Sequence, residues 1–222
     1  TVFTVKKSII SSHKRFTHFK PLNEMPPEDY AAGLAVHITE SLDEAKRLRL
    51  DLIHNHLSFE PVLYNQLIDN KMVSTLHGSA SEPKRRMYHD LLKDELYFSI
   101  SDKEREFAPQ LNYVDTVYNG IDFNLYDVRK GEGEYFVFSG RVVKEKGILS
   151  AIEISKRTKI PLKIAGIITD QKFFDSEVKP HIDNKLITFL GNMSQKQLNQ
   201  LLTKAIAFLF MIEWEEPFGL GP

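Results

Sequence analysis

The sequence predicts an α/β protein with two halves, each built on a parallel sheet. Strand-like apolar runs alternate with helical patterns along the chain, and this alternation is typical of parallel β–α–β units. Near the middle, a charged stretch with Gly131 and Gly133 interrupts the alternation, and the same pattern then starts again. We therefore expect a first domain over residues 1–128 and a second domain over residues 133–222.

The first half contains one long helical pattern among several short strands. After Pro26 and Pro27, apolar residues recur every three or four positions between residues 31 and 48, which predicts an amphipathic helix that packs on a sheet. The expected strands of this half are residues 1–5, 51–56, 71–78, 96–101 and 116–122. The expected shorter helices are residues 61–68, 82–92 and 102–107.

The second half repeats the same order of elements. A helix over residues 148–157 is predicted because Ile148, Ala151, Ile152 and Ser155 recur at helical spacing. Ser194 and Gln197 form a capping-box pattern for a further helix. The expected strands are residues 135–139, 161–166, 186–191 and 205–211, and another helix is expected near residues 175–179.

The amino-acid composition excludes several classes of function. The 222 residues are 42% hydrophobic and 27% charged with a formal net charge of −1, which is ordinary for a globular protein and argues against general nucleic-acid binding. The absence of cysteine excludes disulfides, thiolate zinc sites and cysteine nucleophiles. No apolar run approaches the roughly 18 residues that span a bilayer, and no signal peptide is recognisable, so we expect a cytoplasmic location.

The turn after the first strand of the second half is the best candidate for a ligand site. In open α/β sheets ligands bind outside the carboxyl ends of the strands, where a helix N-terminus favours an anion. Arg141 and Lys146 lie in this turn, so a phosphate or diphosphate is the expected ligand. The spacing fits neither a Walker loop nor the G-x-G-x-x-G pattern. A solvated turn is the alternative that this stretch alone leaves open.

Other strand ends of the second half repeat the signal. Gly166 and Gly191 each follow an expected strand, and a loop of carboxylates follows the last one. Charge runs of this kind are commonly surface patches, but Trp214 and Phe218 among the carboxylates indicate a shaped loop in which a carboxylate needs partners such as sugar hydroxyls. The acidic residues of this loop are Glu213, Glu215 and Glu216.

Short motifs along nearly the whole chain resemble one family in the expected order. GRVVKEKG, PLKIAG, ITFLGNMSQKQLNQLL, AIAFLF and EEPFGL resemble the C-terminal half of the retaining GT-B glycosyltransferases of the family-4 type, also called glycosyl transferases group 1. TLHG, YFSISD and VYNGID resemble the N-terminal half. The resemblance implies two Rossmann-like domains facing each other across a cleft. It also implies retaining transfer of a sugar from a nucleotide-diphospho-sugar to an acceptor hydroxyl, without a metal.

The resemblance also implies roles for individual residues. Arg141 and Lys146, with Gly140 before them, resemble the residues that bind the donor diphosphate. Glu216 resembles the first glutamate of an E-x7-E motif, which holds a hydroxyl of the donor sugar. His77 resembles the histidine that approaches this sugar from the opposite domain. These residues would act through an oxocarbenium-like transition state, with no obvious protein nucleophile.

Further residues are implied at the nucleotide. Phe218 and Gly219 would offer backbone N–H groups near Glu216. The segment from Gly191 resembles the loop that lines the base, so Asn192 and Met193 are candidates there.

No metal or cofactor is expected. His54 and His56 could be mistaken for a metal pair, but no carboxylate cluster accompanies them and the resembled family is typically metal-independent. We interpret them as structural or cleft-lining residues. The donor is expected to be of the UDP type, and the acceptor is a sugar, a lipid or a natural product.

Two departures from the family pattern concern the ends. The second glutamate of E-x7-E would fall beyond Pro222, and the family's first strand and glycine-rich loop would precede Thr1. We therefore expect N- and C-terminal segments of the same enzyme outside this sequence. Two alternatives remain, a nucleotide-sugar-binding module or fragment without catalysis and a GT-B sugar-nucleotide epimerase. Peripheral membrane contact would involve the basic residues Lys84, Arg85 and Arg86.

Overall fold

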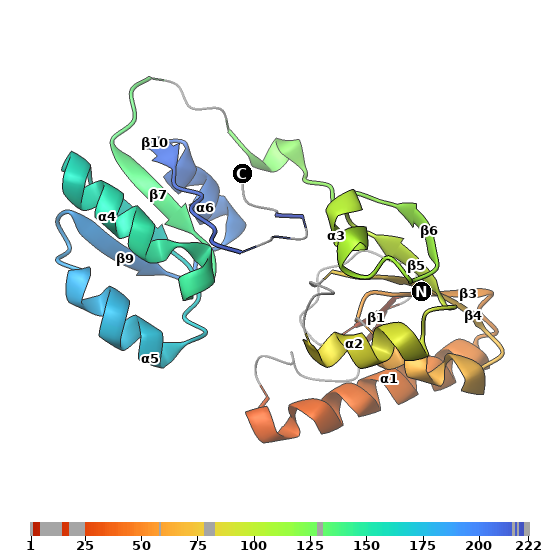
Figure 1. Ribbon diagram of the computed structural model, residues 1–222. Coiled ribbons are helices and arrows are strands. Elements are labelled where there is room, and N and C mark those ends of the chain that lie inside the picture. The colour runs from red at the N-terminus through yellow and green to blue at the C-terminus, as the bar shows by residue number, and fades with distance from the viewer. Residues whose placement is uncertain are drawn as a thin grey trace. The chain divides into compact units, whose positions relative to one another are not determined.

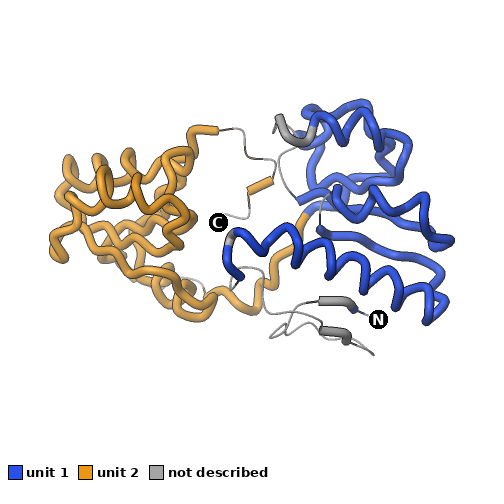
Figure 2. The backbone as a smooth tube through the Cα atoms, turned by 90° about the horizontal axis from the view of Figure 1, so that it is seen from below, with its two compact units in different colours: residues 1–118 blue, residues 119–222 orange. Residues whose placement is uncertain are grey.

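The protein folds into two compact α/β units. The computed structural model describes residues 2–4, 15–17, 25–57, 59–77, 83–127, 131–214, 216, 218 and 219. The units are Thr1–Tyr118 and Asn119–Pro222, drawn in separate colours in Figure 2. Each contains a four-stranded sheet (Figure 1), and the α/β class with two parallel sheets is confirmed. The boundary expected between residues 128 and 133 falls inside the second unit.

The sheet of the first unit is parallel throughout. Its order is β3 (Leu52–Asn55), β4 (Lys71–Thr75), β5 (Leu96–Ser99) and β6 (Tyr113–Thr116). Four of the five residues of β4 are buried, as expected for an inner strand of a parallel sheet that is covered on both faces. Two further short strands, β1 (Val2–Thr4) and β2 (Arg15–Thr17), pair with each other in parallel.

The long helix expected in the first unit is present as α1 (Tyr30–Arg47), preceded by a 3₁₀ turn, η2 (Pro27–Asp29). Its buried face includes Ile38, Leu42 and Ala45, which recur at the spacing that predicted it. Ile38 and Leu42 join the core of this unit with residues of β4 and β5. The shorter helices are α2 (Pro83–Leu91) and α3 (Asp102–Phe107).

Two predictions in the first unit were wrong in detail. The helix expected at residues 61–68 is a 3₁₀ helix, η3 (Glu60–Leu67). The strand expected at residues 116–122 lies earlier, as β6, and residues 117–122 form no strand. The physical reason is that the ring of Tyr113 packs against the buried ring of Tyr97, with centroids 6.5 Å apart, whereas Val117 and Tyr118 are more than half exposed. Tertiary packing therefore outweighs the strand propensity of the residues that follow Thr116.

The sheet of the second unit has the order β10 (Ala205–Phe208), β7 (Tyr135–Ser139), β8 (Leu162–Ala165) and β9 (Ile187–Gly191), again parallel. Side chains of the inner strand β7 alternate between two cores, because successive residues of a strand point to opposite faces. Phe136 and Phe138 pack with α4 (Ile148–Thr158), and Tyr135 and Val137 pack with α6 (Gln195–Leu202). The two helices therefore cover opposite faces of the sheet (Figure 1).

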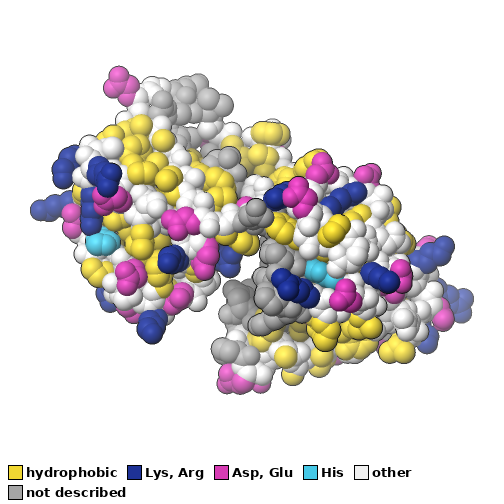
Figure 3. Space-filling model, in the orientation of Figure 1, with side chains coloured by type: hydrophobic (Ala, Val, Ile, Leu, Met, Phe, Trp, Pro, Cys, Tyr) yellow, Lys and Arg dark blue, Asp and Glu magenta, His cyan; other side chains and the backbone are white. Residues whose placement is uncertain are grey.

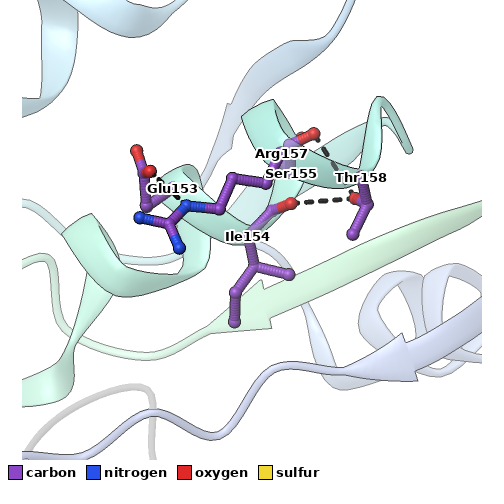
Figure 4. Close-up of polar contacts among 5 residues, drawn as sticks. All are labelled: Glu153, Ile154, Ser155, Arg157 and Thr158. Carbon is purple, nitrogen blue, oxygen red and sulfur yellow. Dashed lines mark hydrogen bonds and ion pairs between the residues drawn. The ribbon is translucent and has the colours of Figure 1, made fainter.

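Helix α4 matches its prediction closely. Its buried residues are the four that predicted it, Ile148, Ala151, Ile152 and Ser155. Near its end, the hydroxyl of Thr158 donates to the backbone oxygen of Ile154 at 2.8 Å, and Arg157 pairs with Glu153 (Figure 4). The helix stops at Lys159, whose left-handed φ of 60° cannot continue an α-helix.

The remaining elements of the second unit differ from prediction mainly in length and type. The helix expected near residues 175–179 is α5 (Gln171–Phe173) followed by a π-helical turn, η6 (Phe174–Val178), and a 3₁₀ turn, η7 (Lys179–His181). The capping box of Ser194 and Gln197 is formed as predicted at the start of α6. Strand β10 ends at Phe208, three residues before the expected end at residue 211. Short 3₁₀ turns are η4 (Phe123–Leu125) and η5 (Lys144–Lys146).

The face of the protein that Figure 3 shows has no dominant charge among its described residues. Acidic and basic side chains are interspersed over the described surface seen in Figure 3, in keeping with a formal net charge of −1. Within the described residues, no helix combines the length and the apolar character that crossing a membrane requires.

Candidate functional site

Backbone hydrogen bonds join the turns at the strand ends of the second unit. The backbone N–H of Gly140, after β7, donates to the backbone oxygen of Ala165 at 3.1 Å. The N–H of Gly166, after β8, donates to the oxygen of Gly191 at 2.8 Å. A Cβ at Gly166 would lie 1.8 Å from the Gly140 oxygen, so only glycine allows this approach. Hydrogen bonds therefore join the turns after β7 and β8 to the end of β9 along one edge of the sheet.

The loop from β7 to α4 places its two predicted cations on either side of a fixed segment. Val142 is fully buried, and its N–H donates to the oxygen of Ile167 at 2.9 Å. Arg141, just before it, is exposed. Lys146 ends the turn η5, and Gly147 then takes a left-handed φ of 70° before α4 begins. Lys146 therefore lies immediately before the free N–H groups of the helix N-terminus, which favours an anionic ligand.

The loop after β10 crosses the first turn of α4. The N–H of Glu213 donates to the backbone oxygen of Glu145 at 2.8 Å, and the Glu213 carboxylate accepts from the hydroxyl of Ser150 at 3.1 Å. A Cβ at Gly147 would lie 1.7 Å from the backbone oxygen of Met211, so a glycine is needed for the close approach of the two segments. Hydrogen bonds thus hold together two segments more than 60 residues apart in sequence, the loop after β10 and the N-terminus of α4.

Lys146 and Glu216 form an ion pair through Nζ and Oε2. Their side chains are only 18% and 20% exposed, so water screens this pair less than an ordinary surface pair. The Lys146 ammonium also lies 5.3 Å from the centre of the Trp214 ring. Two residues predicted for the site are therefore in direct contact, and an aromatic ring stands beside them.

The other predicted residues of the second unit are spread around this pair. A Cβ at Gly219, where φ is 75°, would lie 3.3 Å from Cγ of Glu216. Phe218 is half-buried in the same loop, and Asn192 is exposed after β9. Met193 packs against the buried cluster on the α6 side of the sheet, so at least part of its side chain serves the core.

The predicted histidine of the first unit belongs to a cluster of three. Nε2 of His77 lies 2.8 Å from Nδ1 of His56, and Nε2 of His54 lies 2.8 Å from the hydroxyl of Thr75. The ring centroids of His54 and His56 are 4.2 Å apart. Burial lowers the pKa of all three imidazoles, and repulsion from a neighbouring imidazole lowers the pKa of His56 and His77 further.

This cluster favours neutral imidazoles. A hydrogen bond between two imidazoles requires one of them to donate and the other to accept, so at most one can be protonated on both nitrogens. From the sequence, His56 was interpreted as structural or cleft-lining, and its hydrogen bond to His77 was not predicted. The signal that could have revealed it is the pairing of β3 with β4, which brings the ends of the two strands together.

Solved structures with the same architecture include glycosyltransferases. The glycosyltransferase from Rickettsia africae ESF-5 is 14% identical with a TM-score of 0.66, over 93% of this chain and 61% of its own. TarM is 13% identical with a TM-score of 0.61, over 81% of this chain and 41% of its own. The pneumococcal O-GlcNAc transferase GtfA, solved with UDP and GlcNAc, is 18% identical with a TM-score of 0.59, over 81% and 41%.

These likenesses establish the fold class, which is that of the GT-B glycosyltransferases. This chain spans about half the length of the solved chains it matches, between 41% and 61% for the three above. The family model described as glycosyl transferases group 1 matches residues 127–222, which lie within the second unit. Comparison with curated proteins finds no match.

Proposed function

We propose that this chain provides the donor-binding part of a retaining glycosyltransferase, which moves a sugar from a nucleotide-diphospho-sugar of the UDP type to an acceptor hydroxyl. The observation that carries the proposal is the contact between Lys146 and Glu216 at the N-terminus of α4. It brings together a cation suited to a diphosphate and a carboxylate suited to a sugar hydroxyl. The match of the second unit to the glycosyl transferases group 1 model supports the same chemistry.

Transfer of the sugar requires a site that stabilises the leaving diphosphate. Negative charge gathers on the diphosphate as the bond to the sugar breaks, in a transition state with oxocarbenium character. Arg141, Lys146 and the free N–H groups of α4 would stabilise that charge, each charge-assisted hydrogen bond contributing roughly 1.5–3 kcal/mol. Fixed cations and a helix N-terminus can supply this stabilisation without a metal.

Glu216 would hold the donor sugar by accepting a hydrogen bond from one of its hydroxyls. It would then exchange its present ion pair with Lys146 for the sugar, while the lysine turns its N–H groups to the diphosphate. Phe218, Gly219 and Asn192 are proposed as neighbouring contacts of the donor. His77 enters the proposal through the resemblance of its TLHG motif alone.

Release of the nucleoside diphosphate tests the proposal. UDP-glucose, UDP-N-acetylglucosamine, GDP-mannose and ADP-glucose would each be offered with a panel of sugar acceptors. Replacing Lys146 or Arg141 with alanine should lower turnover by more than about tenfold, because one charge-assisted bond to the leaving group is lost. Lys144→Ala is the matched control, since Lys144 is an exposed cation of the same loop. Equal turnover in all three variants and the wild type would contradict the assignment of the diphosphate site.

The same experiment separates the alternatives. Binding of a nucleoside diphosphate without sugar transfer to any acceptor would favour a nucleotide-sugar-binding module. Formation of an epimerised sugar nucleotide without an acceptor would favour the epimerase.

A further inference from the structure

Trp214 is the only tryptophan of the chain, and its ring stands beside the proposed diphosphate lysine. The Lys146 ammonium lies 5.3 Å from the ring centre, within the distance at which a cation is attracted to the face of an indole. The indole Nε1 is buried and has no hydrogen-bond partner among the described residues. Among the described residues, therefore, no hydrogen bond from Nε1 holds the indole, whereas the Lys146 ammonium lies against its ring.

The ring can hold the lysine in a way that the carboxylate cannot. A lysine head is a compact charge on a flexible stem, with three rotatable N–H donors. Glu216 fixes that head by occupying a donor, so it competes with any phosphate for the same ammonium. An aromatic face attracts the charge without accepting a conventional hydrogen bond. The N–H groups of Lys146 would stay free for an anion while the ring holds the head in place.

The backbone beside Trp214 is itself fastened to the helix N-terminus. Its neighbour Glu213 is bonded to Glu145 through the backbone and to Ser150 through the side chain. Two residues earlier, Met211 touches Gly147 so closely that no side chain fits between them. The ring is thereby tied to the same turn that carries Lys146.

We propose that Trp214 is a positioning residue, which holds the Lys146 ammonium at the N-terminus of α4 for binding of a nucleoside diphosphate. The inference rests on the proposed function of this site. It gives Glu216 and Trp214 different tasks. Glu216 pairs with the lysine while the site holds no ligand, and Trp214 keeps the lysine in place when the carboxylate turns to the sugar.

A double-mutant cycle tests whether Trp214 acts through Lys146. Affinities for UDP, GDP and ADP would be measured by calorimetry for the wild type, Trp214→Leu, Lys146→Met and the double variant. Trp214→Leu should lower the affinity for the nucleotide by about 3- to 30-fold, the range expected for loss of a cation–π contact. In the Lys146→Met background the same change should have an effect of less than about twofold. Trp214→Phe keeps an aromatic face and should restore most of the affinity.

The matching nucleoside without phosphates is the control for a merely structural role. If Trp214 acts through Lys146, its replacement should leave binding of the nucleoside unchanged. Equal losses from Trp214→Leu in the wild-type and Lys146→Met backgrounds would overturn the inference, as would wild-type affinity in Trp214→Leu. Absence of nucleotide binding by the wild-type chain would instead overturn the proposed function.

The contact itself can be tested without any ligand. Because Trp214 is the only tryptophan, the indole fluorescence of the chain reports on its surroundings alone. Lys146→Met should change the emission of the ligand-free chain, and Lys144→Met should not, because Lys144 is exposed. Identical spectra of the wild type and Lys146→Met would show that the ammonium is not held against the ring, and the inference would fail even if the site binds nucleotides.

Discussion

Replacing Gly166 with alanine should disturb the strand-end turn that leads to Arg141. The added Cβ would lie 1.8 Å from the backbone oxygen of Gly140, whereas real Cβ atoms essentially never come closer than 3.0 Å to such an atom. The Gly140 peptide must therefore move by roughly 1 Å, and overpacking of this kind typically costs about 1–3 kcal/mol. For a unit of about 100 residues, each kcal/mol lowers the thermal midpoint by roughly 4–8 °C.

The functional consequence should be of similar size, because a 100-fold loss of rate corresponds to about 2.7 kcal/mol. Gly140 directly precedes Arg141, which we propose binds the diphosphate, and a displacement of about 1 Å at such a group can lower the rate by about 100-fold. Thermal unfolding, nucleotide titration and release of nucleoside diphosphate by Gly166→Ala would measure the effects on stability, binding and rate separately. Gly120→Ala is the control, because a Cβ at Gly120 meets no atom within 4 Å. A Gly166→Ala variant that melts and binds nucleotide like the wild type would refute the reasoning.

Three further outcomes follow from the geometry. Gly147→Ala should destabilise the second unit by more than about 3 kcal/mol in urea unfolding, because a left-handed φ of 70° is combined with a Cβ placed 1.7 Å from a backbone oxygen. Ser194→Ala should cost about 1 kcal/mol in the same assay by removing the cap of α6, and wild-type stability would contradict that role. Acidification from about pH 6.5 to 5 should destabilise the first unit, because a lowered pKa of a folded-state imidazole means that the unfolded chain takes up protons first. Stability lost over this window should be smaller in a variant with glutamine at the three clustered positions, His54, His56 and His77.

Elements with a clear local pattern of apolar residues were predicted well. Strand β7 has its expected bounds, and α4 buries the four residues chosen from its periodicity. Strand β6 was misplaced because its position depends on packing of Tyr113 against Tyr97, a contact with the neighbouring strand. The run after residue 116 looks like a strand by composition, yet Val117 and Tyr118 remain exposed.

Contacts within the candidate site could be predicted only in part. The resemblance assigned Lys146 and Glu216 to one ligand, but their ion pair joins residues 70 positions apart, and no periodicity indicates such a contact. Trp214 was recognised as a sign of a shaped loop, whereas its place against the lysine depends on how the loop crosses α4. The bond between His56 and His77 likewise depends on the pairing of two strands.

The central claim is that the N-terminus of α4 and its two cations form a diphosphate site. Calorimetric titration of the chain with UDP, GDP and ADP, beside the Arg141→Ala variant, tests it most directly. The account predicts that one of the three binds and that the variant binds it at least about tenfold more weakly, the equivalent of one charge-assisted hydrogen bond. Absence of binding by all three, or equal affinity in the variant, would contradict it.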